Sequence, residues 1–148
     1  MSLDTLRLLE HVHGHLGWLA AALLVHPAIV LRDRRRRAHL AVALSTAAVT
    51  IGAGLGVFLY GHYRERLKAD LYASAPDLGQ LFERKEHLAF GAVLLAWAGA
   101  SAYFGAPRAS AAVRATLRTT AFRAFVAASV LALVVAAMGT RVAVHLTF

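Results

Sequence analysis

Histidines gather near the ends of four long apolar stretches, and they are the residues in this chain best suited to chemistry. Imidazole is the side chain that proteins use most to hold haem iron and transition metals. Six of the eight histidines fall where these stretches begin or end on one side: His11, His13, His15, His62, His87 and His145. This pattern predicts a bound cofactor, either haem or a metal ion.

Residue counts along the chain indicate that these histidines lie at one depth. The separations from Arg32 back to His11, from Arg37 to His62, from Pro107 back to His87 and from Arg123 to His145 are 21, 25, 20 and 22 residues. His15 follows His11 by one helical turn and shares its face, whereas His13 points elsewhere. His11 and His15 are therefore alternative ligands from the first helix.

A haem held by two imidazoles needs ligands on opposed helices. With short loops, the first and third helices lie diagonally, as do the second and fourth, so His15 pairs with His87, and His62 pairs with His145 as a second or supporting pair. Gly14 and Gly17 beside His15 leave space for a flat macrocycle. Arg141, one turn before His145, is the leading partner for the haem propionates, with Arg84 or Lys85 as alternatives.

Two other interpretations stay open. His15, His62, His87 and His145 could instead bind a zinc, copper or iron ion directly. The chain could also be an accessory or assembly subunit that holds no cofactor and docks onto a larger membrane complex. His26 and His39, nearer the other side, are more simply explained as structural residues.

The elements that must position these residues are membrane helices. Of the 148 residues 59% are hydrophobic and 16% charged, and the mean hydropathy is +0.58. Spans are predicted at residues 6–31, 38–61, 87–104 and 122–145, each near the roughly 20 residues that cross a bilayer. We expect a single all-α domain, an antiparallel up-down-up-down bundle, with residues 62–86 lying on the outer surface.

Arginines in the connectors predict the orientation of the chain. By the positive-inside rule, both termini face the non-cytoplasmic side, and we expect a bacterial inner membrane protein. The arginines that mark the cytoplasmic side are Arg32, Arg34, Arg35, Arg36, Arg37, Arg108, Arg114, Arg118 and Arg123.

Composition also excludes several classes of function. The net charge is +8, but the arginines lie in short connectors, which argues against a nucleic-acid-binding domain. The chain has no cysteine, which excludes disulfides, thiolate ligands, iron-sulfur clusters and covalently attached haem. A haem would therefore be held without a covalent link.

Four apolar spans that carry His15, His62, His87 and His145 resemble the small four-helix membrane cytochromes b and the cytochrome b subunits of respiratory complexes. The resemblance implies one or two haems b and electron transfer between a quinol and a redox protein or larger complex. It implies an electron-transfer subunit more than a stand-alone enzyme. Because histidines are scarce on the cytoplasmic half, we expect one haem near the outer face.

Overall fold

The structure, a computed structural model, describes residues 2–33 and 36–145, and these residues are all-helical apart from short connectors. Its elements are α1 Leu3–Val30, α2 His39–Arg66, α3 Lys68–Ser74, α4 Pro76–Gly105, the 3-10 turn η1 Ala106–Arg108 and α5 Ala111–Ala143. Four of them, α1, α2, α4 extended by η1, and α5, are long and apolar enough to cross a membrane. The predicted all-helical class is confirmed, and so is the prediction of four helices that are long and apolar enough to cross a membrane.

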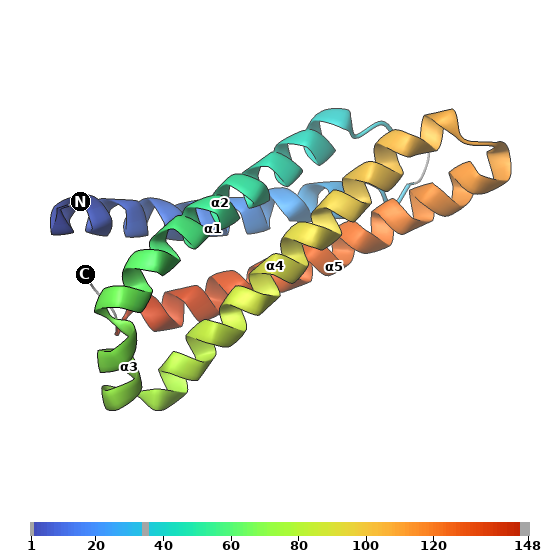
Figure 1. Ribbon diagram of the computed structural model, residues 1–148. Coiled ribbons are helices and arrows are strands. Elements are labelled where there is room, and N and C mark those ends of the chain that lie inside the picture. Colours follow the sequence, from blue (N-terminus) through green and yellow to red (C-terminus); the bar gives the residue numbers. More distant parts are fainter. Residues whose placement is uncertain (1, 34–35, 146–148) are drawn as a thin grey trace.

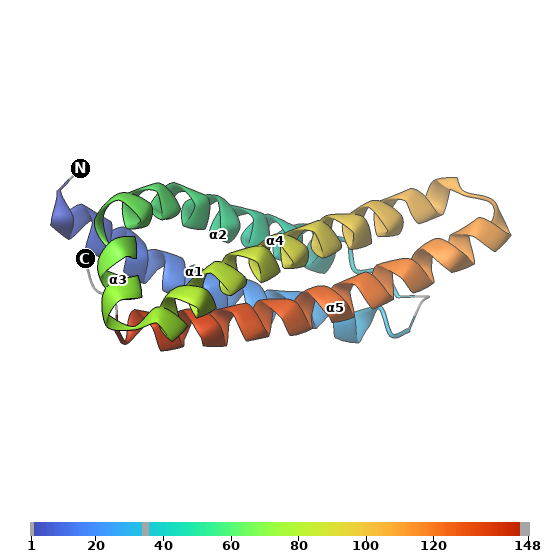
Figure 2. The ribbon, with the colours of Figure 1, turned by 60° about the horizontal axis from the view of Figure 1, so that its bottom comes forward.

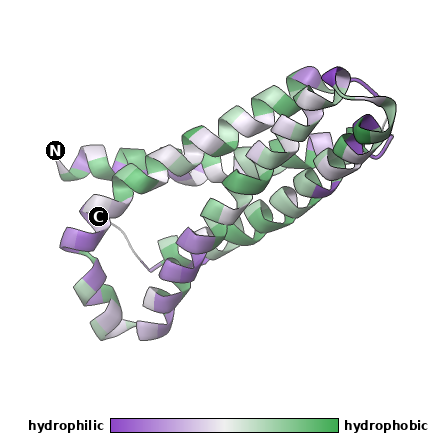
Figure 3. Ribbon diagram, turned by 45° about the vertical axis from the view of Figure 1, so that its right-hand side comes forward, coloured by the Kyte–Doolittle hydropathy of each residue, from purple (hydrophilic) through white to green (hydrophobic). Residues whose placement is uncertain are grey.

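The four long helices lie alongside one another, and short links join them at two ends (Figures 1 and 2). Helix α1 packs against α2 and α5, and α4 packs against the same two helices. Both termini lie at the end that carries α3 (Figure 1). We call this the α3 end; it comprises residues 2–15, 52–87 and 139–145. Hydrophilic residues concentrate at the two ends, and the middle is mainly hydrophobic (Figure 3).

Small side chains bring the helices close together. The buried core is rich in alanine, and its largest fully buried side chain is Phe125 of α5. Phe125 lies on Gly99 of α4, where an added Cβ would come within 3.0 Å of the ring. Because small residues let helices approach and make dispersion contacts in a membrane, this alanine and glycine content accounts for the close packing of α4 on α5.

The connection from α2 to α4 at the α3 end is tight and polar. Tyr63 and Phe82 stack with ring centroids 4.0 Å apart, and Lys68 donates a hydrogen bond of 2.7 Å to Glu83. Tyr72 of α3 packs on Gly79. The predicted surface segment 62–86 is therefore largely helical, because α2 runs on to Arg66 and α4 begins at Pro76, where proline suits the first helical turn.

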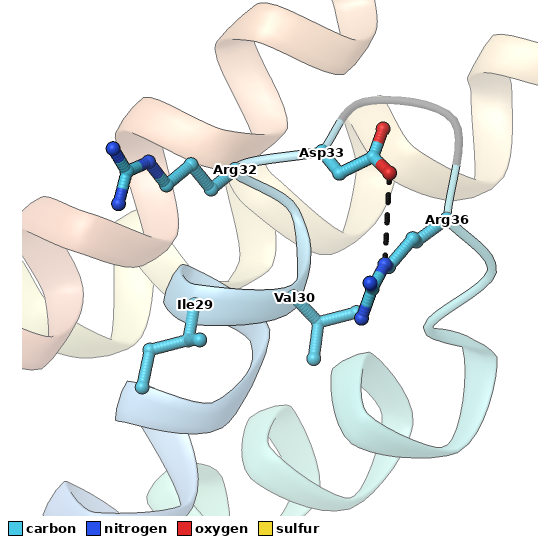
Figure 4. A pocket seen from close by; sticks show the side chains of 5 residues that line it. All are labelled: Ile29, Val30, Arg32, Asp33 and Arg36. Carbon is cyan, nitrogen blue, oxygen red and sulfur yellow. Dashed lines mark ion pairs between the residues drawn. The ribbon is translucent and has the colours of Figure 1, made fainter.

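The opposite end carries the arginines used to predict orientation, although Arg34 and Arg35 lie outside the described residues. Asp33 and Arg36 form an ion pair, with Nε and Oδ2 separated by 3.6 Å. Both line a hollow of about 390 Å³ with Ile29, Val30 and Arg32 (Figure 4). The Arg32 side chain points away from this ion pair (Figure 4).

Candidate functional site

On α1, the histidine that faces the interior at the α3 end is His13. Its ring lies against α2, where a Cβ added at Gly56 would come 2.9 Å from Cε1. The Nδ1 atom is buried and has no hydrogen-bond partner among the described residues. His13 is one heptad after buried Leu6 and one heptad before buried Ala20, so its position follows from the core-facing repeat of α1.

A lysine and a glutamate of α4 reach the same region. Lys85 Nζ lies 3.1 Å from Glu86 Oε1, and the two side chains are only 11% and 21% exposed. The ammonium group also sits 4.4 Å from the centroid of the Phe82 ring, a distance at which a cation and an aromatic face attract. The lysine stem lies near Gly139 of α5, whose added Cβ would be 3.7 Å from Cδ.

We refer to His13, Lys85 and Glu86 as the His13 cluster. The imidazole is close enough to both charged groups to interact with them electrostatically, and it also interacts with the backbone of Gly52. All four long helices meet here, α2 and α5 through glycines. Ionisable groups at this depth are costly unless paired, and here the ion pair and the cation–aromatic contact provide that compensation.

The predicted ligands occupy different positions from the His13 cluster. His11, His15, His87 and His145 are exposed, and His62 is half-buried with its ring 5.4 Å from that of Phe58. Helices α1 and α4, which carry His15 and His87, each pack against α2 and α5 rather than mainly against each other. Within the described residues there is no group of three or more His, Cys, Asp or Glu placed to hold a metal.

Three of these exposed rings share one hydrogen-bonding arrangement. Nδ1 of His11, His87 and His145 contacts the main-chain carbonyl four residues earlier, at 2.7, 2.7 and 3.2 Å. Because a carbonyl oxygen only accepts, Nδ1 carries the proton and donates it. In the neutral ring this leaves the Nε2 lone pair free to bind iron or another metal.

The remaining predicted residues also have defined surroundings. Arg141 is exposed on the last turn of α5, and Lys85, an alternative propionate partner, is engaged with Glu86 instead. His26 is exposed on α1. His39 packs edge-on against Tyr103, with ring centroids 5.4 Å apart, at the end opposite α3.

Sequence reasoning missed the His13 cluster, although a signal for it was present. Lys85 lies seven residues before Ala92 and fourteen before Gly99, both buried on α4, and His13 has the same relation to Ala20 and Pro27 on α1. A charged or polar residue in the register of small core residues is expected to face the interior.

Comparison of the chain with protein-family models, with curated proteins and with solved structures gives no match.

Proposed function

We propose that this chain is an integral membrane haem b protein that transfers electrons, alone or as a subunit of a larger membrane complex. The observation that carries the proposal is the hydrogen bonding of the imidazole nitrogens of His11, His87 and His145. In each ring Nδ1 is held by the main chain of its own helix, and Nε2 has no hydrogen-bond partner among the described residues. Ligating histidines are commonly oriented in this way, and these three lie at the same end of the molecule as His15 and His62.

The proposed topology has four antiparallel spans with both termini on the non-cytoplasmic side, in a bacterial inner membrane. Arginines at the end opposite α3 support it, among them Arg32, Arg36, Arg108 and Arg114, because Lys and Arg in short loops favour the cytoplasmic side. The α3 end, with its histidines, then lies at the outer face.

The candidate ligands are His15, His87, His62, His145 and His11, with Arg141 for the propionates. Four of these imidazoles, those of His11, His15, His87 and His145, are exposed and so accessible, whereas the His13 cluster occupies the interior. A Cβ added at Gly14 or Gly17, beside His15, would meet no atom within 4 Å, so the surface there has room. When bound, the haem would supply one-electron redox chemistry, which the ligands and local charge would tune.

Haem content of single variants tests this assignment. We expect His15→Ala and His87→Ala to lose haem, while His39→Ala, which alters a ring packed against Tyr103 at the other end, should retain it. Equal haem content in all three variants would contradict the ligand assignment. Helical content measured by circular dichroism checks that each variant is folded.

A zinc, copper or iron ion is the second candidate, since a free Nε2 binds such ions as readily as it binds haem iron. Metal analysis of the purified chain separates the two proposals. Stoichiometric metal without a haem spectrum, lost on replacing His62 and His145 by alanine, would favour the ion. Unchanged metal content in that double variant would count against it.

A further inference from the structure

The excess positive charge of this chain lies at one end. The net charge is +8, and residues 29–39 and 103–123, at the end opposite α3, account for all of it. We call this region the arginine end. Nine of the 16 Lys and Arg residues belong to it, all of them arginines, against one of the eight acidic residues, Asp33. The other seven cations are matched by the other seven acids, so the arginine end is the part of the chain that attracts anions.

Part of the arginine end lies where a membrane-crossing helix stops. Helix α1, one of the four that are long and apolar enough to cross a membrane, ends at Val30. The N–H of Arg32 donates a hydrogen bond of 3.2 Å to the carbonyl oxygen of Ile29, so Arg32 lies one turn beyond Ile29. A residue directly beyond the apolar part of a span lies among the lipid headgroups.

Apolar and cationic surfaces meet at this point. Ile29 is 66% exposed and lines the hollow of about 390 Å³ together with Arg32. The side chains of Ile29 and Arg32 both lie on the side of the hollow away from the ion pair of Asp33 and Arg36 (Figure 4). A phospholipid has the same two parts in the same order, an acyl chain in the hydrocarbon and a phosphate at its boundary.

The guanidinium group of Arg32 is available to an anion. Its side chain is exposed and makes no hydrogen bond or ion pair with the residues that the structure describes. Arg108 and Arg114, at the same end, instead donate hydrogen bonds of 3.0 and 3.1 Å to nearby main-chain carbonyls. Because a guanidinium presents paired N–H donors that match phosphate oxygens, Arg32 suits a phosphate group.

We propose that the arginine end binds an anionic phospholipid, with the phosphate on Arg32 and an acyl chain against Ile29. Position identifies the occupant, because a residue at the end of a membrane span borders phospholipid. Charge then selects among lipids, since the excess of arginine favours an anionic headgroup over a zwitterionic one. This site is separate from the histidines at the α3 end and depends neither on haem nor on the orientation of the chain.

Lipid titration followed by native mass spectrometry tests this site. The purified chain in mild detergent is titrated with dioleoyl phosphatidylglycerol, which is anionic, or with dioleoyl phosphatidylcholine, which is zwitterionic. We expect the first phosphatidylglycerol to bind about tenfold more tightly than the first phosphatidylcholine. Arg32→Gln should lower the affinity for phosphatidylglycerol about fivefold, because each cation near an anionic lipid surface contributes roughly a factor of five.

Two variants control for the loss of one positive charge. Arg64→Gln removes an exposed arginine at the α3 end, where the charges balance. Arg114→Gln removes one at the arginine end whose guanidinium is already bonded to the carbonyl of Ala109. Each should change the affinity by no more than about twofold, and circular dichroism checks that every variant is folded.

Equal affinity for the two lipids would overturn the binding of anionic phospholipid. Equal losses in the Arg32 and Arg114 variants would overturn the assignment of the phosphate to Arg32. Displacement of the lipid by an equal concentration of glycerophosphoglycerol, the water-soluble headgroup alone, would refute the acyl-chain contact with Ile29.

Discussion

His13 of α1 lies directly against Gly56 of α2, so that a Cβ at position 56 would come 2.9 Å from the imidazole Cε1. Because the ring is confined between helices, Gly56→Ala should overpack this contact and lower stability by about 1–3 kcal/mol. Thermal unfolding in detergent, followed by circular dichroism, measures the effect.

Gly54→Ala is the matched control, because a Cβ there meets no atom within 4 Å and alanine favours the helix. The double variant His13→Ala/Gly56→Ala should recover much of the loss, since the clashing ring is gone. An equal effect of alanine at positions 54 and 56 would show that His13 does not occupy this contact.

Replacing only one member of the Lys85–Glu86 ion pair should lower the stability of the fold more than replacing both members. Lys85→Met leaves the carboxylate without its counter-charge in a largely buried site, and we expect a loss of about 3 kcal/mol. Lys85→Met/Glu86→Gln should recover part of it. The exposed neighbour Arg84 gives the control variant Arg84→Met, expected within about 0.5 kcal/mol of the natural chain. Equal losses for the Lys85 and Arg84 variants in unfolding experiments would contradict the buried pair.

At the end opposite α3, the Tyr103 side chain caps the N-terminus of α2. Its hydroxyl accepts a hydrogen bond of 2.6 Å from the buried backbone N–H of Ala38, and Ala38, the N-cap residue, has no side chain that could cap the helix itself. Tyr103→Phe leaves that N–H unpaired and should cost about 1–3 kcal/mol. Tyr60→Phe, which removes a hydroxyl with no hydrogen-bond partner among the described residues, should be close to neutral. A neutral Tyr103→Phe variant would argue against this cap.

The link between α3 and α4 should weaken at high pH. The hydrogen bond to Glu83 raises the pKa of Lys68 above its ordinary value of 10.5, so the stabilisation is complete below that value and is lost as pH rises through the folded pKa. The difference in Tm between the natural chain and Lys68→Met should therefore hold up to about pH 10 and shrink between about pH 10 and about pH 12. A difference that stays constant over this range would refute the contribution of the lysine charge.

Hydropathy predicted the number and type of the long helices, but it located some of their ends poorly. The predicted spans 87–104 and 122–145 lie in helices that begin at Pro76 and Ala111. Apolarity marks where a helix can lie in lipid, whereas helical hydrogen bonding continues through polar residues such as Gln80 and Arg114. Short apolar runs in residues 62–86 gave no signal for where α2 would end.

The site was harder to predict than the fold. The depth of a residue in the membrane follows from its position along a span, but the side of the helix on which it lies depends on how the helices pack. His11 and His15 share a face, as predicted, yet that face is exposed and His13 takes the interior position. The face of α1 that points to the interior is the one that carries the buried residues Leu6, Ala20, Leu24 and Pro27. The heptad spacing of Leu6, Ala20 and Pro27 includes position 13, so the periodicity of the core residues was the better guide.

The reduced-minus-oxidised absorption spectrum of the purified natural chain, with dithionite as reductant, tests the central claim most directly. Haem held by two imidazoles predicts a Soret band that shifts on reduction and a sharp alpha band, both lost in His15→Ala and kept in His39→Ala. A folded, colourless protein with neither band would contradict the claim that the histidines at the α3 end bind haem.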